Sequence, residues 1–459
     1  MLTYDLDRTT GPLYERLYRA IREDILQGQL APGEKLPSKR SLADHLKISK
    51  VTVETAYAQL AAEGYIRSQE KVGYFVEAVA GPRVLPTESP RPLPRDTAPC
   101  WDADFTANQL REEAFPFSVW SKLMREVILD YGAELLGPMP ICGADTLRQA
   151  IADYLYGFRS MAVSPDQILV GAGTDFLYNL LVQLLGRDKR YAVEDPGYSK
   201  IQQVYSAAGV SCQPVPLDAD GVLPEALGHA DVLHLSPSHH FPTGIVTPIG
   251  RRQALLEWAE AQPGRYLIED DYDSEFRLAG RPIPTLQSID RAGKVIYLNS
   301  FTKSIAPSIR ISYLVLPPEL MDRFRQQLGF YACTVPSFEQ YTLARFLSRG
   351  YFEKHLARMK KYYREQRDRV IHALEQASFA SRVEILERDA GLHFLLKVKT
   401  TRSDRELKEL CETAGIKIRC LSDYALTTPQ EDSHCLVVNY SGFDGSQAGR
   451  IVEKLERIL

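Results

Sequence analysis

The first 77 residues place hydrophobic positions at helical spacing and then at strand spacing. From Leu13 to Ile25 an apolar residue recurs at every fourth position, which predicts an amphipathic helix. Ser38 and Ser49 are N-cap candidates for two further helices, and Gly64 ends the second. The expected elements are helices at 12–28, 39–46 and 49–64, then strands at 65–68 and 73–78. A helix, a helix-turn-helix and a hairpin in this order predict a small α+β winged helix.

The chain after residue 100 alternates helical patterns with short apolar runs that end in polar residues. The runs are QILVGAG (167–173), RYAVEDPGY (190–198), DVLHLSP (231–237), RYLIEDDY (265–272) and KVIYLNSF (294–301). Strands alternating with helices at this spacing predict a large α/β domain with a mostly parallel sheet. In such sheets ligands bind at the carboxyl ends of the strands, so the polar residues after these runs are the candidates for chemistry.

Between these regions lies a segment rich in proline. Residues 78–100 contain six prolines and no hydrophobic period, as expected for a semi-rigid linker. The chain is therefore expected to hold a winged helix-turn-helix domain at 1–77, a linker at 78–100 and a large α/β domain at 101–459.

Amino-acid composition excludes several classes of protein and agrees with the division of the chain into two domains and a linker. Hydrophobic residues make up 44% and charged residues 25% of the 459, which is typical of globular chains and excludes a disordered or collagen-like one. No apolar run reaches the ~18 residues that span a bilayer, and the start of the chain has no signal-peptide core, so a cytoplasmic protein is expected. The seven cysteines are scattered without a Cys-x-x-Cys pair, which indicates neither a disulfide framework nor a zinc site.

Net charge alone gives no sign of nucleic-acid binding. The chain carries −4, and residues 1–77 hold 11 basic and 11 acidic residues. The charge is nevertheless uneven, because residues 35–50 hold five lysines and arginines against Asp44 alone. In a helix-turn-helix these positions face base edges and phosphates. Ser38, Ser49 and Thr52 add neutral donors for phosphate oxygens, although both serines are equally compatible with capping and the lysines with a solvated face.

The combined pattern of residues 11–77 is more specific than its parts. The stretch LPSKRSLADHLKISKVTVETAYAQLAAEGYI, followed by GYFV, resembles the GntR-type winged helix. The resemblance implies DNA contacts by Arg40, Lys50 and Thr52, with Lys71 in the wing. Lys50 stands where the family usually carries Arg, and a lysine lacks the planar fork that reads a base in a bidentate way.

A polar turn between two apolar strands near residue 300 suggests a reactive amine. The turn holds Ser300, Thr302, Lys303 and Arg310 close together, which suits a phosphate beside a lysine. A lysine near other cations can have a depressed pKa, as imine formation with an aldehyde requires. The same residues also fit a surface lysine with two capping hydroxyls.

Acidic and glycine-rich turns follow other strands. Asp270 comes directly after a buried strand, where a carboxylate needs a cationic partner such as a protonated pyridine nitrogen, and the Tyr272 phenol can bond a ring oxygen. Gly173 precedes a helix whose free N–H groups favour a phosphate. Tyr198 can stack on an aromatic ring, although packing is an equally ordinary role for it.

Together these four strand ends resemble the fold-type I, aminotransferase-like pyridoxal phosphate domain over most of residues 101–459. The resemblance implies that Lys303 holds pyridoxal 5'-phosphate as an internal aldimine. It implies that Asp270 faces the pyridine nitrogen, that Tyr272 bonds the ring oxygen and that Tyr198 stacks on the ring. The phosphate would be held by Gly173, Thr174, Ser300, Thr302 and Arg310.

Two departures from the aminotransferase pattern concern ring and substrate recognition. Phe241 stands where aminotransferases commonly carry the Asn of an Asn-Pro-x-Gly turn. His239 or His240 could take over the role of that Asn, although a surface or packing role is the more ordinary one for each. The C-terminal strand HCLVVNYSG lacks the usual arginine that clamps a substrate carboxylate. Lys200 and Arg419 are the candidates for that role.

A winged helix, a proline-rich linker and an aminotransferase-like domain together resemble the MocR/GabR-type transcription regulators over almost the full chain. This resemblance implies a homodimer that binds a double-stranded DNA operator. The hypothesis is that an amine or amino-acid effector forms an external aldimine and changes operator affinity. The alternatives are an active aminotransferase with an accessory N-terminal domain and a direct sensor of pyridoxal phosphate that controls its synthesis. Enzymatic activity stays open, with residual aminotransferase chemistry as the expectation.

Overall fold

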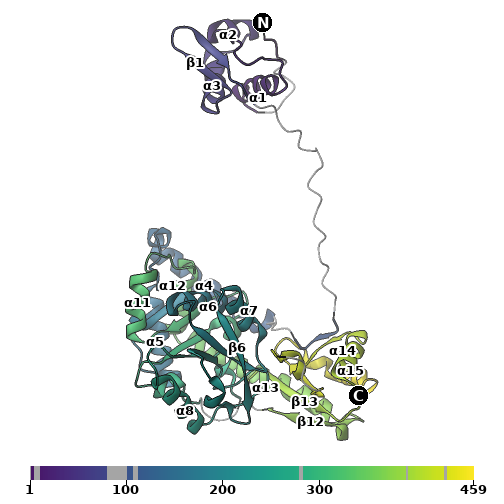
Figure 1. Ribbon diagram of the computed structural model, residues 1–459. Coiled ribbons are helices and arrows are strands. Elements are labelled where there is room, and N and C mark those ends of the chain that lie inside the picture. The colour runs from purple at the N-terminus through teal and green to yellow at the C-terminus, as the bar shows by residue number, and fades with distance from the viewer. Residues whose placement is uncertain are drawn as a thin grey trace. The chain divides into compact units, whose positions relative to one another are not determined.

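The computed structural model describes residues 2–4, 11–79, 101–106, 112–278, 283–388, 391–427 and 432–459. The chain forms two compact units, Met1–Ala98 and Pro99–Leu459 (Figure 1). The segment expected to be a linker, residues 78–100, lies outside the described residues except for its first two.

The small unit is the winged helix that the sequence predicts. Its elements are α1 (Leu13–Leu26), α2 (Lys39–Leu46), α3 (Lys50–Ala62), β1 (Ile66–Gln69) and β2 (Gly73–Val76). Leu17, Ile21 and Ile25 are buried on one face of α1, as their four-residue spacing requires. β1 and β2 pair in antiparallel fashion, with Ile66 opposite Val76. Buried residues of the three helices and the hairpin form one hydrophobic core.

The large unit is built on an eight-stranded mixed sheet. Its strands, in spatial order, are β4 (Ile168–Gly171), β11 (Ser312–Val315), β10 (Val295–Ser300), β9 (Tyr266–Asp270), β8 (Val232–Leu235), β5 (Arg190–Asp195), β6 (Ser211–Asp218) and β7 (Gly221–Val222). The pairs from β10 to β6 are parallel, whereas β11 and β7 are antiparallel to their neighbours. Because β11 runs antiparallel to both β10 and β4, the carboxyl end of β4 lies at the same edge as those of the parallel strands.

Helices cover both faces of this sheet. They are α4 (Phe117–Tyr131), α5 (Asp145–Arg159), α6 (Thr174–Leu185), α7 (Ser199–Ala207), α8 (Ile249–Glu260), α9 (Leu286–Ile289), α10 (Phe301–Ser304), α11 (Pro318–Leu328), α12 (Ser337–Ser348) and α13 (Tyr351–Glu375). Successive strand residues point to opposite faces. Ile168 and Val170 accordingly pack into the core that holds α5 and α12, and Leu169 into the core that holds α6 and α11. Strands buried on both sides explain the continuous apolar runs in the sequence.

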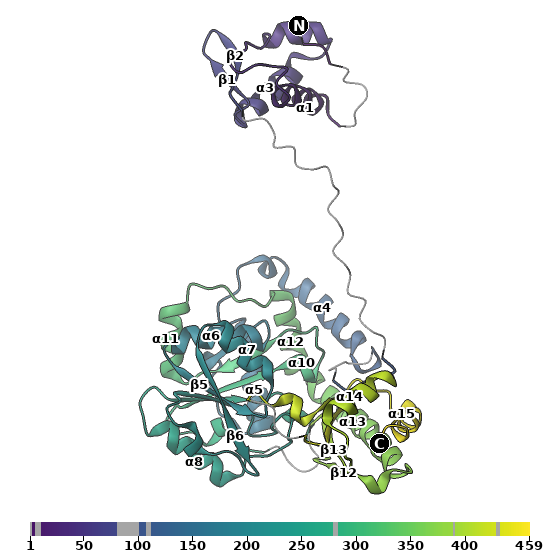
Figure 2. The same ribbon diagram turned by 45° about the vertical axis from the view of Figure 1, so that its right-hand side comes forward.

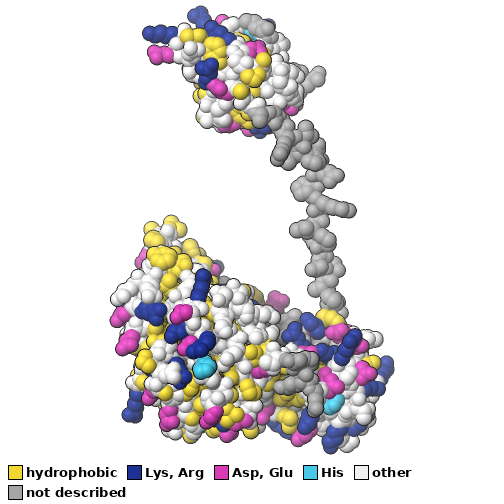
Figure 3. All heavy atoms as spheres, viewed as in Figure 1, with side chains coloured by type: hydrophobic (Ala, Val, Ile, Leu, Met, Phe, Trp, Pro, Cys, Tyr) yellow, Lys and Arg dark blue, Asp and Glu magenta, His cyan; other side chains and the backbone are white. Residues whose placement is uncertain are grey.

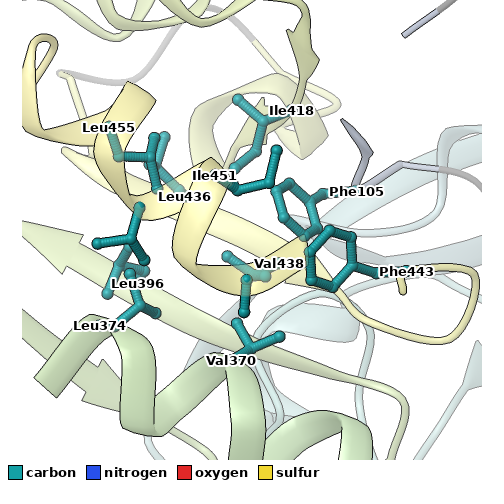
Figure 4. Close-up of a pocket in the computed structure, with 12 residues that line it drawn as sticks. Phe105, Val370, Leu374, Leu396, Ile418, Leu436, Val438, Phe443, Ile451 and Leu455 are labelled. Atoms are coloured by element: carbon teal, nitrogen blue, oxygen red, sulfur yellow. The ribbon is translucent and has the colours of Figure 1, made fainter. Parts of the chain in front are cut away.

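The C-terminal part forms a lobe beside the sheet (Figure 2). It contains α14 (Asp404–Thr413), α15 (Ala448–Glu456) and a four-stranded sheet of β12 (Val383–Leu386), β13 (His393–Val398), β16 (Cys435–Asn439) and β15 (Arg419–Cys420). β14 (Ile416–Lys417) pairs with β3 (Ala103–Asp104). Figure 4 shows side chains from α13, β13, β16 and α15 meeting around a purely apolar cavity of about 20 Å³. The part of the lobe around this cavity is therefore a packed apolar core.

One carboxylate ties the sheet to this lobe. Asp195, the last residue of β5, accepts hydrogen bonds from the backbone of Leu426 at 2.8 Å and from the Thr427 hydroxyl at 2.6 Å. Two residues later the backbone N–H of Gly197 donates to the carbonyl of Tyr424 at 2.9 Å. The loop after β5 and the segment 424–427 are thus bonded side by side.

In the part of the chain that the structure describes, no helix is both long and apolar enough to cross a membrane.

Candidate functional site

A cavity of about 300 Å³ opens at the carboxyl ends of the parallel strands. Because the residues that follow β4, β5, β9 and β10 meet at this edge, the structure brings most of the predicted site residues together. Those that line the cavity are Thr174, Tyr198, Lys200, Asp270, Tyr272, Ser300, Thr302, Lys303 and Arg310.

Lys303 lies on α10, a single helical turn that starts directly after β10. Burial lowers the pKa of its ammonium to about 8, while the carboxylates of Asp273 and Asp270 act in the opposite direction. An amine with this pKa is neutral in a sizeable fraction of molecules near neutral pH. Lys303 can therefore act as a nucleophile toward an aldehyde.

Asp270, at the end of β9, is buried and only half satisfied. Its Oδ2 accepts a 2.7 Å hydrogen bond from the Tyr178 hydroxyl and lies 3.3 Å from His234 Nε2. The other ring nitrogen of His234 lies 2.8 Å from the Tyr205 hydroxyl. Oδ1 of Asp270 is buried without a hydrogen-bond partner among the described residues. A buried carboxylate oxygen without a partner is costly, so this atom suits a cationic donor brought by a ligand.

The glycine turn before α6 brings a guanidinium close to the start of a helix. Gly173 adopts a φ of +90°, and a Cβ at this position would lie 2.4 Å from Nη2 of Arg310. Gly173 is therefore required for the approach of Arg310, although it does not itself line the cavity. In the same cavity Ser300 accepts a 3.1 Å hydrogen bond from the Thr302 backbone and bonds the Thr302 hydroxyl at 2.7 Å. Guanidinium, hydroxyls and helix N–H groups together suit a phosphate.

Lys200 and Arg310 share one carboxylate. Asp175, in the first turn of α6, lies 2.6 Å from Lys200 Nζ and 3.3 Å from Arg310 Nη2. Lys200 therefore lines the cavity as half of an ion pair. Arg419 does not line the cavity: it is exposed on β15, with its guanidinium 5.8 Å from the centre of the Tyr424 ring.

Three tyrosines surround Phe241, the residue that stands in place of the usual Asn. The Phe241 ring lies edge-on to Tyr198, Tyr272 and Tyr424, at centroid distances of 6.3, 6.5 and 5.1 Å. Neither His239 nor His240 lines the cavity, so neither directly takes the position of the usual side-chain amide. Burial lowers the pKa of His240 to about 3, and its Nδ1 bonds the Thr243 hydroxyl at 2.7 Å.

Several residues of the cavity were missed by sequence reasoning. They are Thr106, Tyr178, Glu194, His234 and Asn439. Burial raises the pKa of Glu194 to about 8, the nearby Asp270 adds to this rise, and its Oε2 accepts a 2.9 Å hydrogen bond from the Ser236 backbone. The only sequence signal for Glu194 and His234 was a polar residue inside an otherwise apolar strand.

In the small unit the predicted DNA-contact residues divide into caps and exposed cations. The Ser38 and Ser49 hydroxyls each accept a 3.1 Å hydrogen bond from the first turn of a helix, so both act as N-caps. Thr52 is the partner of Ser49. The exposed cations are Arg40 on α2, Lys50 at the start of α3 and Lys71 in the β1–β2 turn, which has a φ of 58°.

Two family models cover these two units. The model for bacterial regulatory proteins of the gntR family matches residues 13–76, and the model for aminotransferase class I and II matches residues 103–455. The uncharacterized HTH-type transcriptional regulator YdeL of Bacillus subtilis is 38% identical over 91% of this chain and 91% of its own length. The probable rhizopine catabolism regulatory protein MocR of Rhizobium meliloti is 31% identical over 97% of this chain and 93% of its own length. This chain belongs to the MocR/GabR-type transcriptional regulators.

The large unit of this MocR/GabR-type regulator also matches solved structures. The multiple substrate aminotransferase from Thermococcus profundus superimposes with a TM-score of 0.69 and 21% identity, covering 79% of this chain and 92% of that one. The fold of the regulator's large unit is thus that of fold-type I aminotransferases.

Proposed function

We propose that this regulator binds pyridoxal 5'-phosphate in the cavity and that an amine or amino-acid effector changes its affinity for a double-stranded DNA operator. The observation that carries the proposal is the unpaired Oδ1 of Asp270 in the same cavity as Lys303, whose pKa is lowered to about 8. When bound, pyridoxal phosphate supplies an aldehyde carbon that condenses with amines and a ring that withdraws electrons.

Each residue would have a defined task toward a bound cofactor. Asp270 would hold a proton on the ring nitrogen, and the Tyr272 hydroxyl would bond the ring oxygen. Lys303 Nζ would bond the aldehyde carbon. Tyr198, half of whose surface is exposed, would stack on the ring. Arg310, Thr174, Ser300, Thr302 and the backbone at Gly173 would hold the phosphate.

Regulation follows from competition for Lys303. An effector amine that took the place of the lysine on the cofactor would release Lys303 Nζ as a free amine and so break the bond between the protein and the cofactor. If the loss of this bond shifts the equilibrium between two conformations of the protein by about 1–3 kcal/mol, the affinity for the operator changes about 5- to 150-fold. A homodimer presents two winged helices to two half-sites. No repeated turnover is needed.

Borohydride reduction tests the cofactor assignment. The purified protein with added pyridoxal phosphate is reduced, digested and mapped by mass spectrometry, and the cofactor is expected on Lys303. Lys200→Ala is the matched control, because it removes the other lysine of the cavity and should leave labelling intact. Labelling that persists in Lys303→Ala contradicts the assignment.

Fluorescence anisotropy tests whether an effector changes DNA binding. The probe is a labelled DNA duplex from upstream of the gene that encodes this protein. Candidate amines should change the Kd of the cofactor-loaded protein and leave that of Lys303→Ala unchanged. An equal effect on both proteins contradicts regulation through Lys303. Sustained conversion of an amino acid and a keto acid by the purified protein would instead identify an aminotransferase.

A further inference from the structure

Beside the cavity two side chains contact one imidazole nitrogen of a third. Nδ1 of His239 lies 2.9 and 3.1 Å from the two carboxylate oxygens of Asp273 and 3.1 Å from the Tyr272 hydroxyl. His239 and Asp273 are 5% and 3% exposed, and Tyr272 alone of the three lines the cavity. The cavity therefore meets this cluster only through the phenol.

The Asp273 carboxylate determines which nitrogen of the His239 ring carries a hydrogen. An aspartate carboxylate accepts hydrogen bonds and has none to donate, so the bond between Asp273 and Nδ1 requires a hydrogen on Nδ1. Nε2 of His239 is buried without a partner among the described residues, so nothing there favours a proton on that atom. A nitrogen that carries a hydrogen cannot accept one, and the Tyr272 oxygen beside it can therefore only receive.

The phenol consequently keeps its own hydrogen. Burial raises the pKa of Tyr272 well above its usual value, and the carboxylates of Asp273 and Asp270 raise it further. An O–H group whose oxygen faces Nδ1–H points its hydrogen away from that nitrogen. The Asp273 carboxylate can accept this hydrogen, and an acceptor in the cavity that Tyr272 lines can take it over. We propose that Asp273 and His239 are positioning residues that hold the Tyr272 hydroxyl as a hydrogen-bond donor available to a ligand in the cavity.

The backbone packs tightly against this cluster. Gly391 has a φ of +71°, and a Cβ there would lie 2.1 Å from Cε1 of His239 and 2.6 Å from an Asp273 oxygen. The His393 ring lies 5.1 Å from that of His239 and bonds the Pro242 carbonyl at 3.0 Å. Among the described residues, Arg159 and Arg277 line the small pocket beside His239, and Lys303 interacts with the Asp273 charge. His239 is thus fixed in place by its surroundings.

The measurable effect of this hydroxyl rests on the proposed function, that is, on pyridoxal phosphate binding in the cavity. In that function the Tyr272 hydroxyl bonds the ring oxygen of pyridoxal phosphate, at a place where Phe241 can offer no polar atom. A donor on that oxygen withdraws negative charge from it. Losing the donor should therefore raise the protonation midpoint of the bound cofactor by about one pH unit, as expected for a hydrogen bond to a charged group.

Two substitutions of His239 separate a positioning role from a packing role. The amide nitrogen of Asn can replace Nδ1 as a donor, whereas that of Gln lies one bond farther out. The midpoint is read from the visible absorbance of the bound cofactor as a function of pH. His239→Gln should raise the midpoint toward that of Tyr272→Phe, and His239→Asn should leave it near the wild-type value. In the Tyr272→Phe background His239→Gln should add no further shift.

An unchanged midpoint in His239→Gln, an equal shift in His239→Asn, or a further shift in the Tyr272→Phe background overturns the proposal. If His239→Gln does not fold, ¹⁵N spectra of the cofactor-free protein decide, with the ring resonances assigned through His239→Asn. A hydrogen on Nδ1 agrees with the proposal, and a hydrogen on Nε2 alone overturns it. A wild-type protein without a visible band refutes the proposed function, whereas the ring spectrum tests this inference separately.

Discussion

The Tyr178 hydroxyl donates a 2.7 Å hydrogen bond to Oδ2 of Asp270. The bond joins α6 to the end of β9 and occupies one carboxylate oxygen, while the buried Oδ1 has no hydrogen-bond partner within the described ranges of the chain. A residue from a helix and a residue from a strand thus prepare one specific atom for a ligand. The orientation of the carboxylate is set before any ligand arrives.

Asp270→Asn should weaken pyridoxal phosphate binding about 10- to 100-fold, because a hydrogen bond between charged groups is worth ~1.5–3 kcal/mol. Titration of the visible absorbance measures the Kd. Asp322→Asn, an exposed acid on α11, is the matched control and should bind as the wild type does. Equal affinities of Asp270→Asn and the control would show that Oδ1 does not meet the ring nitrogen.

The condensation rate of Lys303 should depend on pH with a midpoint near 8. The neutral amine is the nucleophile, so lowering the pH below the lysine's pKa should reduce the rate about tenfold per unit, and raising it well above 8 should have little further effect. Stopped-flow absorbance after mixing cofactor-free protein with pyridoxal phosphate measures this rate. A midpoint near 10 would show that burial does not lower the pKa of this lysine.

Glu194 should make the cofactor-free protein less stable as the pH rises. Its pKa is raised to about 8 in the folded state against an ordinary 4.5, so the unfolded chain ionises first and the free energy of unfolding falls between these two values. Glu194→Gln should therefore raise Tm more at pH 8 than at pH 5. The exposed Glu225→Gln is the control, and a gain equal at both pH values would contradict the raised pKa.

The proposed homodimer should depend on exposed apolar residues of the large unit. Leu129, Leu136 and Phe330 are 74%, 81% and 76% exposed, and Figure 3 shows hydrophobic side chains gathered where Figure 1 places α4 and α12. Burying such residues against a second copy is favourable. Leu129→Lys with Leu136→Lys should yield a monomer in sedimentation velocity. Leu410→Lys, on α14, should remain dimeric, and a dimeric double variant would place the interface elsewhere.

Lys50→Ala should weaken binding to duplex DNA and reduce the slope of log K against log salt by about one per protomer, as loss of one phosphate contact does. Ser49→Ala should instead lower the stability of the winged helix by about 1 kcal/mol, because the Ser49 hydroxyl caps α3. Salt titrations of DNA binding measure the first effect, and thermal unfolding measures the second. An unchanged salt slope in Lys50→Ala would remove it from the interface.

Residues at strand ends could be predicted because the parallel sheet brings those ends together. Lys303 and Asp270 both follow apolar runs, and both line the cavity. Tyr178 and His234 could not be found in this way. The helical pattern of α6 does not say which turn meets the cavity, and His234 stands inside a strand that reads as apolar. Tertiary contacts alone give these two residues their role.

The antiparallel strand β11 shows the corresponding limit for the fold. The sequence predicted a mostly parallel sheet, and β10 and β9 are parallel as expected. β10 ends at Ser300 and β11 begins at Ser312, so the connection is shorter than the dozen or more residues that a parallel crossover usually needs. That count was available in the sequence, although the pairing partners of the strands were not.

The hydrogen bonds from Leu426 and Thr427 to Asp195 link the loop at the cavity to a segment near the end of the chain. Tyr198 follows Asp195 by three residues and lines the cavity, while residues 426–427 come after β15 in the chain, and Leu426 packs against the core that holds α6 and α11. The loop that carries Tyr198 is therefore not independent of residues 424–427, because a change in the position of one segment strains the hydrogen bonds that hold the other.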